Sequence, residues 1–251
     1  MTRITYINLL IYTGSMEKRG IGHIEFILSF ILFITFAIFA IAIFNPIKTS
    51  KLTDSALPYA TSEIIKNTSV DLTIYSVKIN LADTPPGQNV IALEILNIPS
   101  DYNVRVEDYN GNILPSKKEG SIVYIDFDNQ NFVLIKLSKD LEPYAPAPSE
   151  TPAVNTAYYE IASSSVEKII SEKRLLALNK SYYESYELIK NNLKIPAQLN
   201  FAFLARFSEQ ESIISRKDMP DSVEVFSYLK RTEILRSNGG SSFADFGVNI
   251  W

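Results

Sequence analysis

The pattern of hydrophobic and polar positions divides the chain into stretches of different period. Residues 26–44 read FILSFILFITFAIFAIAIF, nineteen residues without a charge. About twenty apolar residues span a bilayer as a helix that satisfies its own backbone hydrogen bonds. Pro46 ends the run, because the residue before a proline avoids helical dihedral angles. The pattern predicts one transmembrane helix over residues 21–46, and no other stretch is long and apolar enough to span.

After the apolar run the period changes twice. Residues 53–67 have helical spacing, with Pro58 expected to break or kink the first turn, and from Val70 hydrophobic residues alternate with polar ones. Alternation indicates strands, and Asn110-Gly111 is a strong hairpin signal. We expect an antiparallel sandwich-like arrangement within residues 47–140. Its strands are expected over residues 70–81 with a bulge in the middle, 90–98, 102–109, 121–127 and 131–137.

A proline-rich segment follows. Residues 142–152 contain four prolines, which is typical of an extended spacer. We place a linker at residues 141–156 and a second unit of α+β character at residues 157–251. The alternative is that the two sheet-forming halves associate into one domain. That unit should hold one long amphipathic helix from Leu175 to Leu193. Further strands are expected over residues 199–207, 211–215, 223–235 and 243–251. The whole chain is therefore predicted to be α+β.

Charge and composition restrict the chemistry. The net charge is −4, there is no cysteine, and His23 is the only histidine. Acidic residues outnumber basic ones, so the chain has no excess of positive charge to neutralise phosphates. Nucleic acid is therefore not an expected partner. Without cysteine, and with its one histidine beside the apolar run, the chain has no residues for Ser-His-Asp hydrolysis or for histidine or thiolate metal sites. We expect no catalytic residues, no metal and no cofactor.

The residues before the apolar run set its orientation. Lys18 and Arg19 favour the cytoplasmic side, although Lys48 and Lys51 weaken the asymmetry. This predicts a single-pass protein of the cell membrane with a cytoplasmic N-terminus and an extracellular C-terminal region. An ordinary secretory signal has a shorter apolar region and a small-residue cleavage site, so it is the weaker interpretation.

The segment Lys18-Arg19-Gly20, followed by Ile21-Gly-His-Ile-Glu25 and the long apolar run, resembles the class III signal peptide of type IV pilins and archaeal pilin-like proteins. The resemblance covers about thirty residues. It implies that a prepilin peptidase cuts between Gly20 and Ile21 and leaves the apolar helix on the mature protein. Residues 1–20 would then be a leader, and the first fifteen of them are either leader or an over-extended gene start.

By the same resemblance, Glu25 would sit at the fifth mature position and pair with the N-terminal amine of a neighbouring subunit during assembly. A carboxylate in an apolar helix is costly unless paired, which agrees with such a role. In the alternative interpretation, Glu25 lies at the edge of the tract and simply reaches the membrane interface. The expected partners are the lipid bilayer, a prepilin peptidase, and copies of this chain or other pilin-like subunits.

Several weaker motifs have an ordinary structural interpretation. The acidic segment Asp126–Asn131 could be a calcium loop, but it lacks the glycine and the final glutamate of one, so a hairpin turn is preferred. The tyrosines at 158, 159, 182, 183 and 186 could form a platform for sugars or peptides, but core packing is the better interpretation. Asn238–Ser242 should be a turn between strands. The glutamates at 167, 172, 184 and 187 alternate with basic residues as on a solvated helix surface. Asn67 and Asn179 begin acceptor sequons for glycosylation.

Three functions remain open. The leading one is a pilin-like or pseudopilin-like structural protein of the surface, assembled through its N-terminal helix. The second is a membrane-tethered extracellular binding module that does not polymerise. An extracellular enzyme is the least favoured, because no nucleophile, base or metal constellation stands out.

Overall fold

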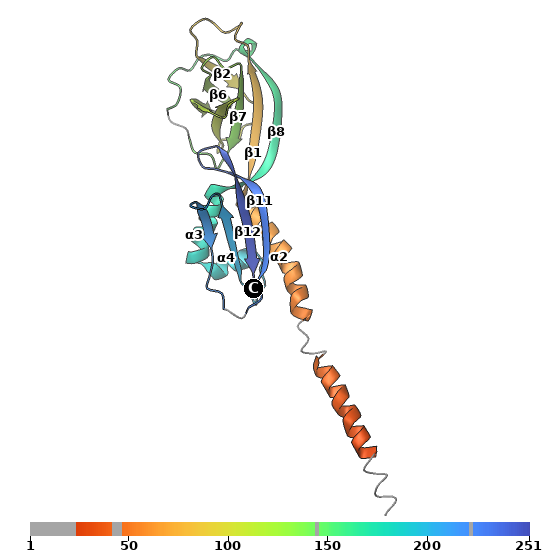
Figure 1. The fold of residues 1–251 in the computed structure, drawn as a ribbon. Helices are drawn as coiled ribbons and strands as arrows, with labels where there is room; N and C mark the ends of the chain where they lie inside the picture. The colour runs from red at the N-terminus through yellow and green to blue at the C-terminus, as the bar shows by residue number, and fades with distance from the viewer. Residues whose placement is uncertain (1–23, 42–46, 144–145, 221–222) are drawn as a thin grey trace, which may run out of the picture. The chain divides into compact units, whose positions relative to one another are not determined.

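The computed structural model describes residues 24–41, 47–143, 146–220 and 223–251. For residues 47–54 it describes the backbone only. The chain forms two compact units, Met1–Leu52 and Thr53–Trp251, which are described separately. The first contains the helix Ile24–Ile41, drawn in red to orange in Figure 1. This confirms a helix over the central part of the residues predicted to span, while positions 21–23 and 42–46 lie outside the described residues.

The second unit is built mainly from strands, with helices at one end of its sheet (Figure 1). The helix α2 (Ile47–Thr68) continues through Pro58, where we expected a break or kink. A nine-stranded sheet has the order β10-β9-β12-β11-β8-β1-β7-β3-β4, and a second sheet has the order β2-β6-β5. The strands are β1 (Ser69–Ile79), β2 (Val90–Glu94), β3 (Asn103–Asp108), β4 (Ile113–Leu114), β5 (Ser116–Glu119), β6 (Ile122–Asp126), β7 (Phe132–Ser138), β8 (Tyr159–Ser171), β9 (Phe201–Arg206), β10 (Ser212–Ser215), β11 (Phe226–Leu235) and β12 (Ser241–Ile250).

The strands β1 to β7 form what we call the sandwich half. The faces of the two sheets enclose a core of alternating apolar residues, as expected when strands bury every second side chain. Residues 109–112 connect β3 and β4, with Gly111 at a φ of 83°, so the Asn-Gly signal marks a real turn. The predicted bulge in the first strand is also confirmed, because the register between β1 and β8 shifts at Ser76/Val77.

The helical half consists of α2, α3 (Glu172–Glu184), α4 (Tyr186–Asn192) and the strands β9 to β12. One core joins the inward residues of β9 and β12 to Ile64 of α2, Leu175 and Tyr182 of α3, and Tyr186 of α4. The expected single helix from Leu175 to Leu193 is wrong: it is divided at Ser185, whose dihedral angles (φ −150°, ψ 52°) are not helical. The division leaves both tyrosine rings packed against Phe201.

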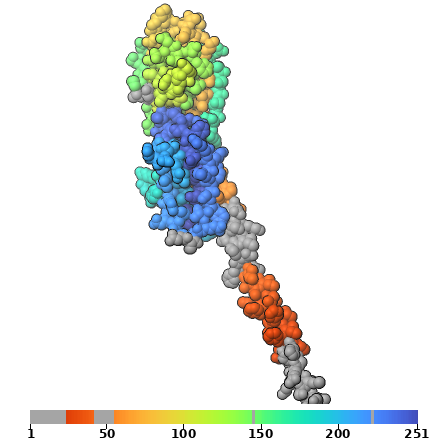
Figure 2. All heavy atoms as spheres, in the orientation of Figure 1, coloured from red at the N-terminus to blue at the C-terminus, as the bar shows by residue number. Residues whose placement is uncertain are grey.

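The two halves belong to one unit, so the expected division at residues 141–156 is not a domain boundary. The strand β8, which lies after the proline-rich segment, pairs antiparallel with β1 over the whole length of β1, from Ser69 to Ile79. The hydrophobic pattern does not reveal β8, because most of its side chains are polar or small and face solvent, so they have no apolar period. In Figure 2 the surfaces of the sandwich half (yellow to green) and of the helical half (blue) meet directly.

The pairing is antiparallel throughout except where β8 meets β11. These two strands pair in parallel at Ile234↔Ile170 and Leu235↔Ser171. The turn after β11 contacts the segment that follows β7, because Glu142 N–H donates to the Ser237 carbonyl (3.3 Å). The turn expected at 238–242 is confirmed in part: it spans residues 236–240, and Ser241 and Ser242 already belong to β12. Arg236 N–H donates to the Gly240 carbonyl across it (2.9 Å).

This turn packs closely on the sandwich half at Gly239. Its φ is 92°, and a Cβ there would lie 2.5 Å from Nε and 2.6 Å from Cγ of Arg105 on β3. We expect Gly239→Ala to lower the free energy of unfolding by about 2–3 kcal/mol, about 1–2 from the left-handed backbone and about 1 from displacing Arg105. Urea unfolding followed by far-ultraviolet circular dichroism measures this loss.

Gly111→Ala is the matched control for this prediction. Its φ is 83°, but nothing lies within 4 Å of the added Cβ. Only the backbone cost of about 1–2 kcal/mol is expected. Equal losses in the two variants would show that the contact between the turn and Arg105 contributes nothing.

Candidate functional site

The predicted processing residues fall outside the part of the chain that the structure describes. Lys18, Arg19, Gly20 and Ile21 all precede residue 24. Glu25 is the second residue of the helix Ile24–Ile41 and is exposed. Its proposed partner, the mature N-terminus, begins at an undescribed residue, so pairing of Glu25 stays a prediction.

The helix Ile24–Ile41 is apolar on every side. Among the helices of the described residues, it is the one that is long and apolar enough to cross a membrane. Its large side chains are exposed by 40% or more, and Thr35 satisfies its hydroxyl internally by donating to the Ile31 carbonyl (2.8 Å). A helix that is hydrophobic all round requires an apolar surrounding, either a bilayer or other helices.

The two sequons lie on helices of the second unit. Asn67 is exposed near the end of α2, and its Nδ2 donates to the Glu63 carbonyl (2.8 Å). Asn179 is half-buried on α3, and its Oδ1 accepts from Ser215 Oγ (2.7 Å). Both side-chain amides are therefore engaged in local contacts, and their glycosylation stays a prediction.

Most of the other motifs have the structural roles that we preferred. Asp126 is the last residue of β6, and residues 127–131 form the turn to β7, with Asp128 and Asn129 at positive φ. Tyr182 and Tyr186 are buried in the core of the helical half. Glu184 pairs with Lys180 on the surface of α3. Three residues differ from the expectation. Glu167 lies on the strand β8 instead of a helix, and the ring of Tyr183 is 60% exposed instead of packed in the core. Glu172 is only 14% exposed and pairs with Arg236 (3.3 Å) instead of facing solvent.

A cavity of about 540 Å³ lies where α2, β1, β8 and α3 come together. No sequence motif marks this cavity, because its walls come from five separate parts of the chain. Most of its lining is polar or charged, with cations and carboxylates both present. The lining residues are Ser62, Ile65, Lys66, Ser69, Val70, Asp71, Asp101, Tyr102, Lys139, Lys168 and Arg174.

One wall of this cavity is held by a charge-assisted contact. Arg174 Nε donates to Asp140 Oδ2 at 2.7 Å, and Nη1 of the same guanidinium donates to the Ser69 carbonyl. These bonds join α3 to the start of β1 and to the segment after β7. Because the guanidinium is already occupied, Arg174 acts mainly as a rigid part of the wall.

Four charged side chains at the cavity have no such partner. Among the described residues, no ion pair joins Asp71, Asp101, Lys139 or Lys168 to anything else. Asp71 and Lys168 are nevertheless direct cross-strand neighbours of β1 and β8. Opposite charges at such positions can form an ion pair. Because Asp71 and Lys168 do not form one, both charged groups are available to a ligand.

Tyr102 adds a phenol beside these carboxylates. Its ring packs against the core of the sandwich half, and its N–H donates to the Pro99 carbonyl (3.2 Å). Burial raises the pKa of Tyr102, and the charges of Asp71 and Asp101 raise it further while Arg174 lowers it. The phenol therefore keeps its proton and can donate a hydrogen bond.

A second cavity of about 270 Å³ shares Ile65, Ser69 and Lys168 with the first. It continues toward β11, where Tyr228, Lys230 and Glu233 line it. Next to both cavities, the nine residues from Glu160 to Lys168 are all exposed on β8. This part of β8 pairs with β1 on one side, and β11 joins the other side only at Ile170 and Ser171.

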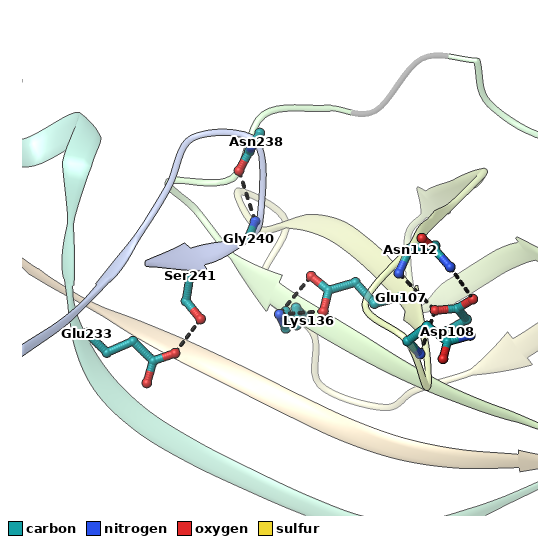
Figure 3. Close-up of polar contacts among 9 residues, drawn as sticks. Glu107, Asp108, Asn112, Lys136, Glu233, Asn238, Gly240 and Ser241 are labelled. Carbon is teal, nitrogen blue, oxygen red and sulfur yellow. Dashed lines mark hydrogen bonds and ion pairs between the residues drawn. The ribbon is translucent and has the colours of Figure 1, made fainter. Parts of the chain in front are cut away.

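Other polar clusters serve the fold. Lys136 Nζ donates to both carboxylate oxygens of Glu107 at 2.7 Å, close to the turn that carries Asn238 and Gly240 (Figure 3). Asp108 accepts from the backbone and the side chain of Asn112 (2.8 Å each), and these bonds hold its pKa below the ordinary value. These groups are engaged with each other and leave no free acid, base or nucleophile.

Comparison with protein-family models, with curated proteins and with solved structures found no match for this chain.

Proposed function

We propose that this chain is a membrane-anchored surface protein of the pilin-like class, assembling through its N-terminal helix. The observation that carries the proposal is the helix Ile24–Ile41, which is apolar on all sides and belongs to a separate compact unit from residues 53–251. The second unit has hydrophobic cores built from its own residues. The helix is therefore free to serve as an anchor.

The basic and small residues before the helix support processing of the pilin type. In this proposal a prepilin peptidase cuts between Gly20 and Ile21, and Lys18 and Arg19 keep the leader in the cytoplasm. The second unit then lies outside the cell. Glu25 pairs with the amine of Ile21 of a neighbouring subunit, which removes the cost of a lone carboxylate among apolar side chains.

The mature N-terminus tests the processing step. We expect the chain, expressed with a prepilin peptidase, to have the intact mass of a protein that starts at Ile21, and a bulky substitution such as Gly20→Phe to leave the leader attached. A mature N-terminus beyond Phe44 would mean that the helix is removed, and the proposal would be wrong.

The assembly step is tested separately at Glu25. We expect Glu25→Gln to remain in the membrane fraction but to lose large assemblies in cross-linking and size-exclusion experiments. Ser29→Ala, on the same helix, is the matched control and should assemble normally. If Glu25→Gln assembles as the parent does, the chain is an anchored module that does not polymerise.

That second candidate, a tethered extracellular binding module, has its own supporting observation. The cavity of about 540 Å³ carries charged groups that have no ion-pair partner within the described residues. Binding through this cavity is compatible with either form of anchoring, because its lining residues all belong to the second unit.

A further inference from the structure

The cavity formed by α2, β1, β8 and α3 has the size and the lining of a ligand site. Its volume, about 540 Å³, is within the range of roughly 300–1,000 Å³ typical of small-molecule pockets. Its walls come from several elements, and Arg174 ties three of them together. Arg174 therefore gives the cavity one fixed wall, and a rigid wall lowers the entropy cost of binding.

The unpaired groups define which ligand chemistry fits. Lys139 and Lys168 offer ammonium donors, which bind a carboxylate by charge-assisted hydrogen bonds. Asp71 and Asp101 offer only acceptors, so they select donors such as hydroxyl groups. A dense polyanion is disfavoured, because it would meet these two carboxylates at close range.

Tyr102 adds a third kind of contact. It lies close enough to Asp71 and Asp101 for their charges to act on it, and its phenol stays protonated at neutral pH. Part of the ring is packed in the core of the sandwich half, which fixes its orientation. A fixed aromatic ring beside carboxylate acceptors suits a ligand with both an apolar face and hydroxyl edges.

We propose that this cavity binds an acidic saccharide, a sugar unit that carries a carboxylate, through Lys139, Lys168, Asp71, Asp101 and Tyr102. The two lysines hold the ligand carboxylate, the two aspartates accept hydrogen bonds from ring hydroxyls, and Tyr102 borders the sugar ring. The site lies wholly within the second unit, so it does not depend on whether the anchor helix is processed or assembles.

Titration calorimetry on the full chain in detergent tests this proposal with trigalacturonate as the probe. Galactotriose, acetate and free lysine are the comparison ligands. We expect saturable binding of trigalacturonate, and at least about tenfold weaker binding of galactotriose, because the neutral sugar lacks the carboxylate that the lysines hold. Acetate and lysine should not compete at equal concentration.

Variants of the cavity give the second part of the test. Asp101→Asn and Lys139→Met should each weaken trigalacturonate binding by about tenfold. Their matched controls are Asp83→Asn and Lys78→Met, exposed residues that do not line the cavity, and both should bind as the parent does. Circular dichroism confirms that each variant is folded.

Four results would overturn the proposal. The first is no binding of trigalacturonate at millimolar concentration by the folded parent. The second is equal affinity for galactotriose, which would remove the role of the carboxylate. The third is full competition by acetate or lysine, which would make the cavity a site for small ions or zwitterions. The fourth is equal loss of binding in the cavity variants and in their controls.

Discussion

Glu107→Gln is expected to lower the free energy of unfolding of the second unit by about 3–5 kcal/mol. Glu107 and Lys136 form an ion pair at 2.7 Å whose side chains are only 9% and 12% exposed. Removing one charge leaves the other buried without its counter-charge, and that is more costly than losing an exposed pair. Urea unfolding followed by the fluorescence of Trp251, the only tryptophan and a buried one, measures the change.

Two further variants separate the cost of an unpaired charge from other effects. Glu119→Gln removes one partner of the Lys117–Glu119 pair, in which Glu119 is 56% exposed, and should change stability by at most about 1 kcal/mol. The double variant Glu107→Met/Lys136→Met removes both charges and should recover most of the loss. A loss below about 1 kcal/mol for Glu107→Gln would show that solvent screens this pair.

Tyr182→Ala is expected to cost about 3–5 kcal/mol, the range found when a buried aromatic ring is removed. Tyr182 is 1% exposed and packs edge-to-face against Tyr186, Phe201 and Phe203. Its hydroxyl donates to the Phe201 carbonyl at 2.6 Å, so Tyr182→Phe should still cost about 1–3 kcal/mol by leaving that carbonyl unsatisfied. The same urea experiment measures both variants.

Tyr183→Ala is the neighbouring control. Tyr183 is 60% exposed, although its hydroxyl donates to the Ile214 carbonyl (3.2 Å), so a loss of only about 1 kcal/mol is expected. Equal losses for Tyr182→Ala and Tyr183→Ala would mean that the core of the helical half is not packed as described.

The pH dependence of stability gives an independent check on Tyr182. Burial, and next the neighbouring Tyr186, raise the pKa of Tyr182 above its ordinary value of 10.0. Below pH 10 the phenol is neutral in both the folded and the unfolded chain. Above pH 10 the unfolded chain ionises first, so stability should fall with rising pH, and it should fall less in Tyr182→Phe.

The sequence predicted those parts of the fold that depend on local chemistry. The apolar run, the alternation after Val70, the Asn110-Gly111 turn and the bulge near Ser76 all depend on residues close together in the chain, and each is present. The division at Ser185 could not be read from the pattern, because the hydrophobic spacing continues across it.

The long-range features could not be predicted in the same way. The strand β8 is stabilised by pairing with β1 about ninety residues earlier, and its serines carry no hydrophobic signal. The cavity depends on Arg174 reaching the Ser69 carbonyl, 105 residues away in sequence. No local spacing relates such residues, so their convergence follows only from the topology of the sheet.

The strand β8 also has a consequence for handling the isolated second unit. From Glu160 to Lys168 one side of its backbone has no neighbouring strand among the described residues, and three small serines occupy its middle. Unpaired backbone N–H and C=O groups of an edge strand can pair with a strand of another molecule. The charged residues at the two ends of this segment give only limited protection against such pairing. A truncated form without the apolar helix would therefore have an exposed strand edge at which fibrils can nucleate. Its loss during storage would depend on protein concentration more than on its melting temperature.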